Sequence, residues 1–493
     1  MHNYLSIDLG TMGIKTCLID EQGNLITCQS YEYAIHSEKH GEALQDANEW
    51  WKGLQKGLSQ IKESFKREFD QVAAISICGQ MHTHVYLDEH NEMLGKAITW
   101  LDQRGDKIIQ EWKDVGIYEK LFELTANFPT TSYTAPNIIR IKKENPDMYK
   151  KAKKILLAKD YIKFKLTGMM VTDPSDASGT LLYDVENLKW SEEAFEILDI
   201  EKVLFPEVAP SIQIMGRITK EASAEIGLKE GIPVINGGSD HAVAEIGSGL
   251  FESGSVSVIV GTAGVVASCS DKPKKDHKRR IICWAYPLEG KWDLLGITQT
   301  AAASLTWFRN TFDSGSDGEI FKVYSKIASE VEAGSQGLIF LPYLLGERTP
   351  YWDSKARGVY FGLSMNHKKA HMVRAIMEGV VFSLRNCMDV FEELGIGLTS
   401  IKTLGGGSKS PVWRQIEASV FNKPVSTIEA EEPSAIGNFI LASLGTGNIK
   451  DVEEAKGFIQ VTQREQPDKE EHQVYNRQYE KFLKLYDNLK ELY

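Results

Sequence analysis

The first thirty residues alternate between short apolar runs and turn-forming residues. The apolar runs at 4–8, 14–19 and 25–31 predict three strands. They are separated by Gly-Thr-Met-Gly at 10–13 and by Glu-Gln-Gly-Asn at 21–24, both of which favour tight turns. With connections this short, the three strands form a β-meander rather than a strand–helix unit.

A helical period follows the meander. Apolar side chains recur at three- or four-residue steps from Trp51 through Leu58 to Phe65, which predicts a helix over 48–68. The apolar run 72–78 then predicts another strand. Helices and strands alternate from there to about residue 250, which indicates an α/β protein with a parallel sheet at its centre.

The pattern of the N-terminus recurs half a chain later. Residues 255–270 again have the form strand, Gly-Thr-x-Gly, strand, with Gly-Thr-Ala-Gly at 261–264. A repeat this long is no solenoid and indicates two lobes of similar construction. We therefore predict domains at 1–249 and 250–493. A third glycine cluster, at 404–410, precedes a helix-like run.

Composition and charge narrow the functional classes. Of the 493 residues, 42% are hydrophobic and 25% charged, which is typical of a globular chain. The net charge of −12 argues against a nucleic-acid partner, because there is no basic stripe to displace phosphate counterions. No apolar stretch of about 18 residues occurs, so we expect no membrane partner. The N-terminus resembles no signal peptide, which favours a cytoplasmic protein.

The six cysteines are scattered and none belongs to a CxxC pair. Several lie in apolar, strand-like runs, as Cys78 does at the end of 72–78. We expect them to be buried and reduced, as in a cytoplasmic protein, rather than to form a disulfide framework.

The three glycine clusters suggest phosphate binding. Backbone N–H groups of a glycine turn approach phosphate oxygens closely because no Cβ intervenes, so three such turns suggest a polyphosphate ligand. The alternative for each cluster is a turn that merely needs positive φ. The chain has no Walker A, HExxH or GxSxG motif, which excludes a P-loop nucleotidase and the hydrolases that those motifs mark.

Two aspartates follow predicted strands directly. Asp8 stands before the first glycine turn, where a carboxylate can hold Mg²⁺ through water. Asp240 ends the segment Asn-Gly-Gly-Ser-Asp at 236–240, where it can accept a proton from a substrate hydroxyl. Taken alone, Asp8 is better explained as an Asx-type turn residue, and Asp240 is equally well explained as a loop carboxylate.

Residues at two further strand ends suit a polyol. His82 and His84 flank Thr83, and Trp100 precedes Arg104 by four residues. Imidazoles, an aromatic face and a guanidinium suit sugar hydroxyls, although such a tryptophan also packs in many cores. A metal role for the histidines lacks a third ligand at a recognisable spacing.

Taken together, these segments resemble the FGGY carbohydrate kinases and, within them, the xylulokinases. The resemblance runs from Ile-Asp-Leu-Gly-Thr at 7–11 to Leu-Gly-Gly-Gly-Ser at 404–408, almost the whole chain. A series of this length in the family's order is very specific. The other segments that carry it are 79–82, 100–104, 159–161, 172–180, 237–240, 342–350, 357–363 and 371–378.

The resemblance implies a ribonuclease H-like, actin-type α/β fold with two lobes around a cleft for ATP and sugar. It implies transfer of the γ-phosphoryl group of ATP to a sugar hydroxyl, most simply D-xylulose to D-xylulose 5-phosphate, with Mg²⁺. By position, Asp240 is the expected catalytic base and Asp8 the carboxylate near Mg²⁺. Met81, His82 and Trp100 are expected to bind the sugar, together with Asp240.

The nucleotide contacts are expected from the glycine turns. By resemblance, Gly261 and Thr262 bind the ATP phosphates, and Gly406 and Gly407 lie against the nucleotide. Thr11, in the first turn, is expected to contribute on the N-terminal side. The resemblance is also compatible with a homodimer formed through the C-terminal lobe.

This chain departs from the family pattern at five positions. Asn137 and Arg140 stand where the family usually has Lys and Trp. Thr83 and His84 follow the Met-His pair, where xylulokinases generally have Gly next, and His241 replaces their common Asn after the catalytic Asp. These departures leave open a kinase for another sugar or polyol, such as L-xylulose, ribulose, gluconate or glycerol. Other readings are an actin-type ATPase without kinase activity and a catalytically silent sugar sensor.

Overall fold

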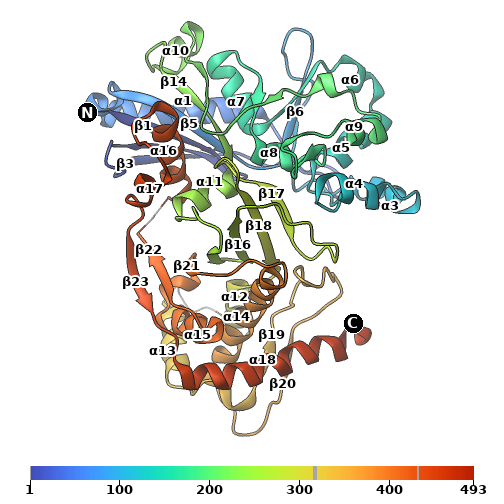
Figure 1. Ribbon diagram of the computed structural model, residues 1–493, viewed down its shortest axis with the longest axis vertical. Helices are drawn as coiled ribbons and strands as arrows, with labels where there is room; N and C mark the ends of the chain where they lie inside the picture. Colours follow the sequence, from blue (N-terminus) through green and yellow to red (C-terminus); the bar gives the residue numbers. More distant parts are fainter. Residues whose placement is uncertain (1, 315–318, 430–431) are drawn as a thin grey trace. The chain divides into compact units, whose positions relative to one another are not determined.

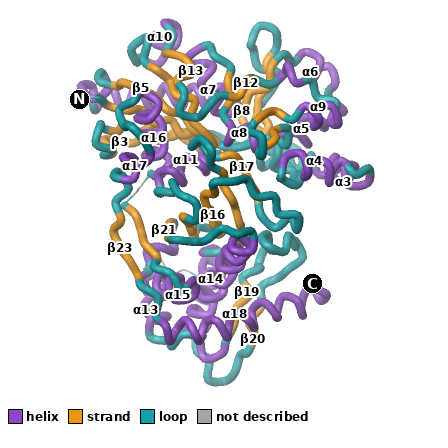
Figure 2. The backbone as a smooth tube through the Cα atoms, viewed as in Figure 1, coloured by secondary structure: helices purple, strands orange, loops and turns teal. Residues whose placement is uncertain are grey.

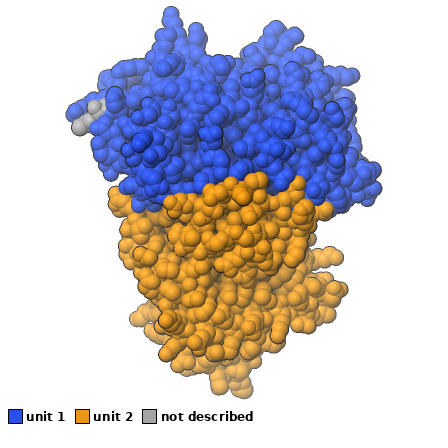
Figure 3. Space-filling model, viewed as in Figure 1, with its two compact units in different colours: residues 1–251, 283–292, 430–459 blue, residues 252–282, 293–429, 460–493 orange. Residues whose placement is uncertain are grey.

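In the computed structural model of the chain, residues 2–314, 319–429 and 432–493 are described. The chain divides into two units, coloured separately in Figure 3. The first unit consists of Met1–Phe251, Cys283–Trp292 and Ala430–Ile459. The second consists of Glu252–Ile282, Asp293–Glu429 and Gln460–Tyr493. The domain boundary at 249/250 stays a prediction, because these two units are defined by how the chain packs and not by its sequence.

The first unit is built on a six-stranded sheet with the order β13-β14-β5-β1-β2-β3. The meander β1–β2–β3 is antiparallel, and β1, β5 and β14 are parallel to one another. This is the predicted meander followed by a parallel centre. The strands are β1 (Asn3–Leu9), β2 (Gly13–Ile19), β3 (Leu25–Glu32), β5 (Val72–Gly79), β13 (Ile214–Arg217) and β14 (Pro233–Ser239).

Helix α1 (Ala47–Ser64) packs on this sheet through the apolar stripe that the sequence predicted. Asp46 caps it by accepting the N–H of Asn48. The predicted helix over 48–68 is interrupted at Phe65, whose φ of −134° and ψ of 47° are not helical, and α2 (Lys66–Phe69) follows. The buried stripe includes Trp50, Leu54, Leu58 and Ile61.

A helix from late in the sequence belongs to the same unit. In Figure 1, α16 (Pro433–Thr446), drawn in red, lies beside β1, β5 and the green α11 (Asp240–Gly247). Its Asn438 donates to Ser6 Oγ at 2.9 Å and accepts from Ser76 Oγ at 2.8 Å. No local pattern in the sequence predicts this pairing, because the partners lie more than 350 residues apart.

A second late segment is bound to the first unit by hydrogen bonds. Cys283 exchanges two hydrogen bonds with the Asn127 side chain, and the Ala285 N–H donates to Ser178 Oγ at 3.0 Å. Trp284 is thereby placed among residues of the first half of the chain. The segment begins with β17 (Ile282–Ala285).

The remaining elements of the first unit form small sheets and helices. One sheet has the order β4-β7-β6-β8, and two strand pairs are β10-β11 and β12-β9. These strands are β4 (Leu44–Gln45), β6 (His84–Leu87), β7 (Ala97–Ile98), β8 (Lys154–Leu157), β9 (Val171–Thr172), β10 (Tyr183–Asp184), β11 (Lys189–Trp190) and β12 (Glu207–Val208). The helices are α3 (Asp106–Asp114), α4 (Ile117–Thr125), α5 (Thr134–Glu144), α6 (Pro146–Lys151), α7 (Ala158–Thr167), α8 (Pro174–Ser178), α9 (Glu192–Leu198), α10 (Lys220–Ile226) and α17 (Val452–Lys456). Of these helices, α5, α7 and α8 are largely buried.

The sheet of the second unit repeats the first. Within this unit its strands run in the order β18-β16-β15-β21-β22-β23, with β15–β16 antiparallel and β15, β21 and β22 parallel. Thus β15 and β16 correspond to β1 and β2, and β21 and β22 correspond to β5 and β14, which confirms two units of similar construction. The strands are β15 (Ser255–Val260), β16 (Gly264–Ser270), β18 (Trp292–Thr298), β21 (Ser400–Leu404), β22 (Val425–Ile428) and β23 (Val461–Glu465).

Helices and long loops make up most of the rest of the second unit (Figure 2). Within the described ranges, no helix combines the length and apolar character needed to cross a membrane. The helices are α12 (Ala302–Phe312), α13 (Ile320–Ser329), α14 (Lys369–Glu393), α15 (Pro411–Phe421) and α18 (Lys469–Leu489), and β19 (Ile339–Leu341) pairs with β20 (Val359–Phe361).

The expectation that all six cysteines are reduced is wrong for one pair. Cys17 on β2 and Cys28 on β3 form a disulfide. They are eleven residues apart in sequence, but the register of the two antiparallel strands places them directly opposite each other, with their Cα atoms 4.0 Å apart. The other four are buried thiols, as predicted: Cys78, Cys269, Cys283 and Cys387.

Candidate active site

The carboxyl ends of three parallel strands place the two predicted aspartates close together. In the register of β1, β5 and β14, Asp8 lies opposite Cys78, which lies opposite Gly238. Asp240 follows β14 directly and is the first residue of α11. Open α/β sheets bind ligands at the carboxyl ends of their parallel strands, so the two carboxylates lie where a substrate is expected to bind.

Asp240 has a strongly perturbed titration. Burial and then the negative charge of Asp8 raise its pKa to about 7, although the His241 N–H donates to Asp240 Oδ1 at 2.8 Å. Burial also raises the pKa of Asp8, and hydrogen bonds from Ser434 and Cys78 partly offset it. A carboxyl group with a pKa near neutrality can both accept and release a proton at physiological pH.

Both aspartates line one cavity of about 480 Å³ in the first unit. It includes the first glycine turn, where a Cβ on Gly13 would stand 2.7 Å from the Tyr31 carbonyl oxygen. Gly13 therefore lets the turn lie directly against β3, which a larger residue would prevent. The lining residues are Asp8, Gly10, Met12, Gly13, Lys15, Ser30, Glu32, Asp240, His241, Ala244 and Ser434.

Thr11 does not line this cavity with its neighbours. Its hydroxyl accepts the indole N–H of Trp100 at 2.9 Å, and its carbonyl accepts from Gln45. Thr11, which the sequence assigned to the nucleotide, and Trp100, which it assigned to the sugar, are therefore in contact with each other. The pair joins the first glycine turn to the segment that carries Trp100.

The Met-His loop follows β5. Met81 and His82 are both buried, and His82 has a φ of 65°. Burial lowers the pKa of His82 to about 4, so its ring is neutral at pH 7. Its Nδ1 lies 2.6 Å from the Gly179 carbonyl oxygen, which can only accept. Nδ1 must therefore carry the proton, and Nε2 is left as an acceptor.

Aromatic rings surround the His82 imidazole. The Tyr133 ring lies 4.9 Å away and the Trp284 ring 5.6 Å away, centroid to centroid. The indole N–H of Trp284 donates to the Tyr133 hydroxyl at 3.3 Å. Sequence reasoning missed Trp284, because its membership of this group depends on the late segment that joins the first unit.

Four of the five departures from the family pattern are buried in or near this loop. Thr83 Oγ1 accepts the Trp100 backbone N–H, and His84 Nδ1 lies 3.1 Å from the His82 carbonyl oxygen. Arg140 donates to Asn137 Oδ1 at 3.2 Å, and its charge contributes to lowering the pKa of His84 to about 4, after burial. All four residues are buried.

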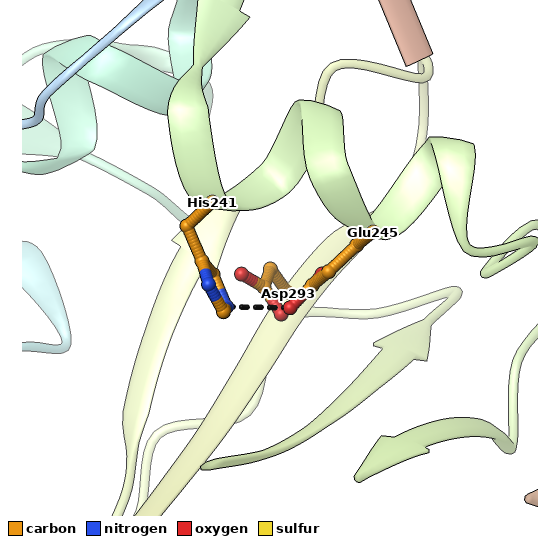
Figure 4. A group of neighbouring side chains, drawn as sticks. All are labelled: His241, Glu245 and Asp293. Atoms are coloured by element: carbon orange, nitrogen blue, oxygen red, sulfur yellow. Dashed lines mark ion pairs between the residues drawn. The ribbon is translucent and has the colours of Figure 1, made fainter. Parts of the chain in front are cut away.

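The fifth departure, His241, lines the cavity beside Asp240. Figure 4 shows its ring pointing to Glu245, one turn further along α11, with Nε2 and Oε1 2.5 Å apart. Glu245 is itself buried. The third residue drawn, Asp293, belongs to β18 of the second unit.

Sequence reasoning also missed cavity residues that carry charge. Lys15 on β2 lines the cavity and forms an ion pair with Glu432 at 2.6 Å. Glu32 and Ser434 also line the cavity. A lysine seven residues after the aspartate that precedes a glycine turn is a signal that could have found Lys15. No local signal points to Ser434, which α16 brings to the site.

The nucleotide residues predicted in the second unit fall into two groups. The Gly261–Thr262 turn accepts hydrogen bonds from the start of α12: Ala301 N–H to the Thr262 carbonyl at 2.9 Å, and Ala302 N–H to the Gly261 carbonyl at 2.8 Å. The turn between β15 and β16 is thus tied to the amino end of a helix, where phosphates bind favourably.

Gly406 and Gly407 line a separate, largely apolar cavity of about 600 Å³ within the second unit. A Cβ on Gly407 would stand 2.5 Å from Val260 Cγ1, so a side chain there would collide with β15. The lining residues are Ala302, Leu305, Thr306, Phe321, Lys322, Ser325, Met377, Gly406, Gly407, Lys409, Ser410, Pro411 and Trp413.

This chain is similar to known kinases over almost its whole length. A xylulose kinase of Lactococcus lactis is 34% identical to this chain, covering 99% of it and 97% of the relative. A gluconokinase of Bacillus licheniformis is 32% identical, covering 98% and 95%.

Solved structures match over the same extent. A protein named xyloylose kinase, from Brucella ovis, superposes with a TM-score of 0.94 at 27% identity and covers 100% of both chains. A gluconate kinase from Lactobacillus acidophilus gives 0.93 at 28% identity, covering 99% of this chain and 98% of its own. Residues 3–247 match the N-terminal domain of the FGGY family of carbohydrate kinases, and residues 256–446 match its C-terminal domain. The chain belongs to the FGGY family of carbohydrate kinases.

Proposed function

We propose that this kinase transfers the γ-phosphoryl group of ATP to a hydroxyl of D-xylulose and forms D-xylulose 5-phosphate. The observation that carries the chemistry is Asp240, a carboxyl group with a pKa of about 7 that shares a cavity with Asp8 at the end of the parallel strands. The choice of sugar rests on relatives named xylulose kinase.

Asp240 is the proposed base. Its carboxylate accepts the proton of the sugar hydroxyl as that oxygen attacks the γ-phosphorus, and the bond from phosphorus to the bridging oxygen of ADP breaks. Positioning and charge stabilisation dominate such a transfer, because its transition state is loose. A positioned base contributes roughly 10²–10⁴-fold.

Asp8 is the proposed ligand of Mg²⁺, through water. The fit rests on charge: two carboxylates line one cavity, and the charge of Asp8 raises the pKa of Asp240. A divalent cation neutralises such a concentration of negative charge, and magnesium favours carboxylate and water oxygens. When bound, Mg²⁺ would neutralise charge on the phosphate oxygens.

Met81, His82 and Trp100 are the proposed sugar contacts. With Nδ1 donating to Gly179, His82 offers Nε2 as an acceptor for one sugar hydroxyl. Its neutral state at pH 7 follows from the pKa of about 4. The aromatic rings that pack around the His82 imidazole hold this acceptor in a fixed orientation.

In the second unit, Gly261 and Thr262 are the proposed contacts of the ATP phosphates. Gly406 and Gly407 are the proposed contacts of the nucleoside, because the cavity that they line is mostly apolar and suits a purine ring. Thr11 is proposed to act through its glycine turn, whose neighbours Gly10 and Gly13 line the cavity of the first unit.

The function is tested by measuring kcat/KM for ADP release with Mg-ATP across D-xylulose, L-xylulose, D-ribulose, gluconate and glycerol. We expect D-xylulose to give the highest value. Gluconate is the strongest rival, because gluconokinases are among the relatives with comparable identity. A higher value for gluconate would keep the kinase mechanism and replace the sugar; ADP release unaffected by any of these compounds would contradict the proposal.

The pH dependence follows from the pKa of Asp240. The base must be deprotonated, and its pKa of about 7 lies above the ordinary value, so activity is lost as the pH falls through 7. We expect kcat/KM for the sugar, measured below saturation with ATP, to fall about tenfold per pH unit below the pKa of Asp240, and excess Mg²⁺ to move that fall below pH 7 because the ion offsets the charge of Asp8. A profile that stays flat down to pH 5 would rule out Asp240 as a base with this pKa.

A further inference from the structure

The segment 172–179 connects the sugar loop to the catalytic loop. It contains Asp173 and the short helix α8 (Pro174–Ser178), which lies near β14 in the first unit (Figure 1). At one end, the Ser239 N–H, next to Asp240, donates to Ser175 Oγ at 3.0 Å. At the other end, the Gly179 carbonyl accepts from His82 Nδ1. The segment 172–179 therefore contacts both the loop that carries the proposed base and the loop that carries the proposed sugar ligand His82.

Asp173 holds Ser175 in a single orientation. Its Oδ2 accepts the Ser175 N–H at 2.9 Å and the Ser175 hydroxyl at 2.6 Å. Because the hydroxyl proton is committed to Asp173, a lone pair of Ser175 Oγ is directed at the Ser239 N–H. The same Oδ2 accepts the Ser211 hydroxyl at 2.9 Å, and Lys159 Nζ lies 2.9 Å from Oδ1.

The surrounding ion pairs make this arrangement stiff. Lys159 also lies within 3.2 Å of Asp160 and of Asp176, and all of these side chains are fully buried. Lys163 binds both Asp160 and the side chain of Asn236, the first residue of the Asn-Gly-Gly-Ser-Asp segment. The catalytic loop is thus bound at Asn236 and again at Ser239, both times from the same buried network.

Glycines bring the loop close enough for these bonds. A Cβ on Gly237, whose φ is +74°, would stand 1.7 Å from the Ile77 carbonyl oxygen. A Cβ on Gly238 would stand 3.1 Å from Ser175 Oγ. The backbone before Asp240 therefore lies directly on β5 and on Ser175, with no room to move toward either.

We propose that Ser175, oriented by Asp173, is a positioning residue that sets Asp240 relative to the sugar held by the His82 loop. This inference rests on the proposed function, since it assigns Ser175 a part in that reaction. Ser175 touches neither reactant. It acts through the backbone N–H of Ser239, the residue before the base.

The chain offers a matched control. Ser175→Ala and Ser211→Ala each remove one buried hydroxyl that donates to Asp173 Oδ2, but only Ser175 also accepts from Ser239. We expect Ser175→Ala to lower kcat about tenfold while KM for sugar and for ATP changes less than about twofold. It should also raise the ratio of ADP to sugar phosphate formed. Ser211→Ala should stay within about twofold of the wild type in each quantity.

Amide hydrogen exchange tests the same proposal without relying on activity. Loss of its acceptor should speed exchange of the Ser239 amide about tenfold or more in Ser175→Ala, and Ser211→Ala should leave it unchanged. Equal kcat losses in the two variants, or a loss in Ser175→Ala that appears only in KM, would overturn the positioning role, as would unchanged exchange at Ser239. A wild type that phosphorylates no sugar would instead contradict the proposed function, while the exchange result would still decide whether Ser175 holds the loop.

Discussion

Replacing Asp240 by asparagine is expected to lower kcat for sugar phosphorylation by roughly 10²–10⁴-fold. The amide has the same shape and can still accept the His241 N–H, but it cannot take a proton from the sugar. The folded protein should not lose stability, because burial and Asp8 make the ionised carboxylate unfavourable at this position. The variant should therefore bind ADP with the affinity of the wild type and melt no earlier at pH 8.

The matched control is Asp114→Asn, at the exposed end of α3, which should leave kcat unchanged. Turnover is measured as sugar phosphate formed, and ADP binding is measured by calorimetry. An Asp240→Asn variant that turns over within about tenfold of the wild type would remove Asp240 as the base. A loss of turnover accompanied by a lower melting temperature would instead indicate a folding defect.

The largest expected effect on stability comes from Lys159→Met. Lys159 is fully buried and lies between three buried carboxylates, Asp160, Asp173 and Asp176. Methionine fills most of the volume but leaves these carboxylates without their shared cation. Removing one partner of a buried ion pair costs about 3–5 kcal/mol, because an uncompensated charge stays in a low-dielectric interior. We expect a loss of that order in the free energy of unfolding.

Lys165→Met provides the comparison on the same helix, α7. Lys165 is partly exposed and lies over the Trp51 ring at 5.1 Å, so its loss should cost about 1 kcal/mol or less. Urea unfolding followed by far-UV circular dichroism measures both variants. Similar midpoints for the two would show that the buried network contributes little to the stability of the first unit.

The sequence predicted the local features of the fold well, because they depend on neighbouring residues. Alternation and turn residues located β1, β2, β3 and β5, and the repeated Gly-Thr-x-Gly predicted the second sheet. The helical period predicted α1, but not its interruption at Phe65. Apolar spacing continues through that residue, and only the backbone angles reveal the break.

Features that depend on pairing between distant segments escaped prediction. Asn438 and Ser434 reach the first unit only because α16 packs on its sheet, and Trp284 reaches it through a hydrogen-bonded late segment. The Cys17–Cys28 disulfide required the register of two strands, which spacing alone does not give.

The candidate site likewise contains residues that the sequence located and residues whose role depends on the fold. Asp8 and Asp240 were found because each follows a strand, and parallel strands bring such ends together. The role of His84 and Arg140 was open from the sequence, since a departure from a pattern says nothing about where a side chain points. His84 contacts the His82 carbonyl oxygen and Arg140 acts on His84 by its charge, so their influence on sugar choice would act through the His82 loop.

The most direct test is to identify the product by ³¹P NMR in a mixture of the protein, Mg-ATP and D-xylulose. The account predicts that the γ-phosphate signal of ATP disappears while the signals of ADP and of one phosphomonoester appear in equal amounts, with the phosphate on the O5 oxygen of xylulose. Inorganic phosphate in place of the phosphomonoester, or ATP that stays intact, would contradict it.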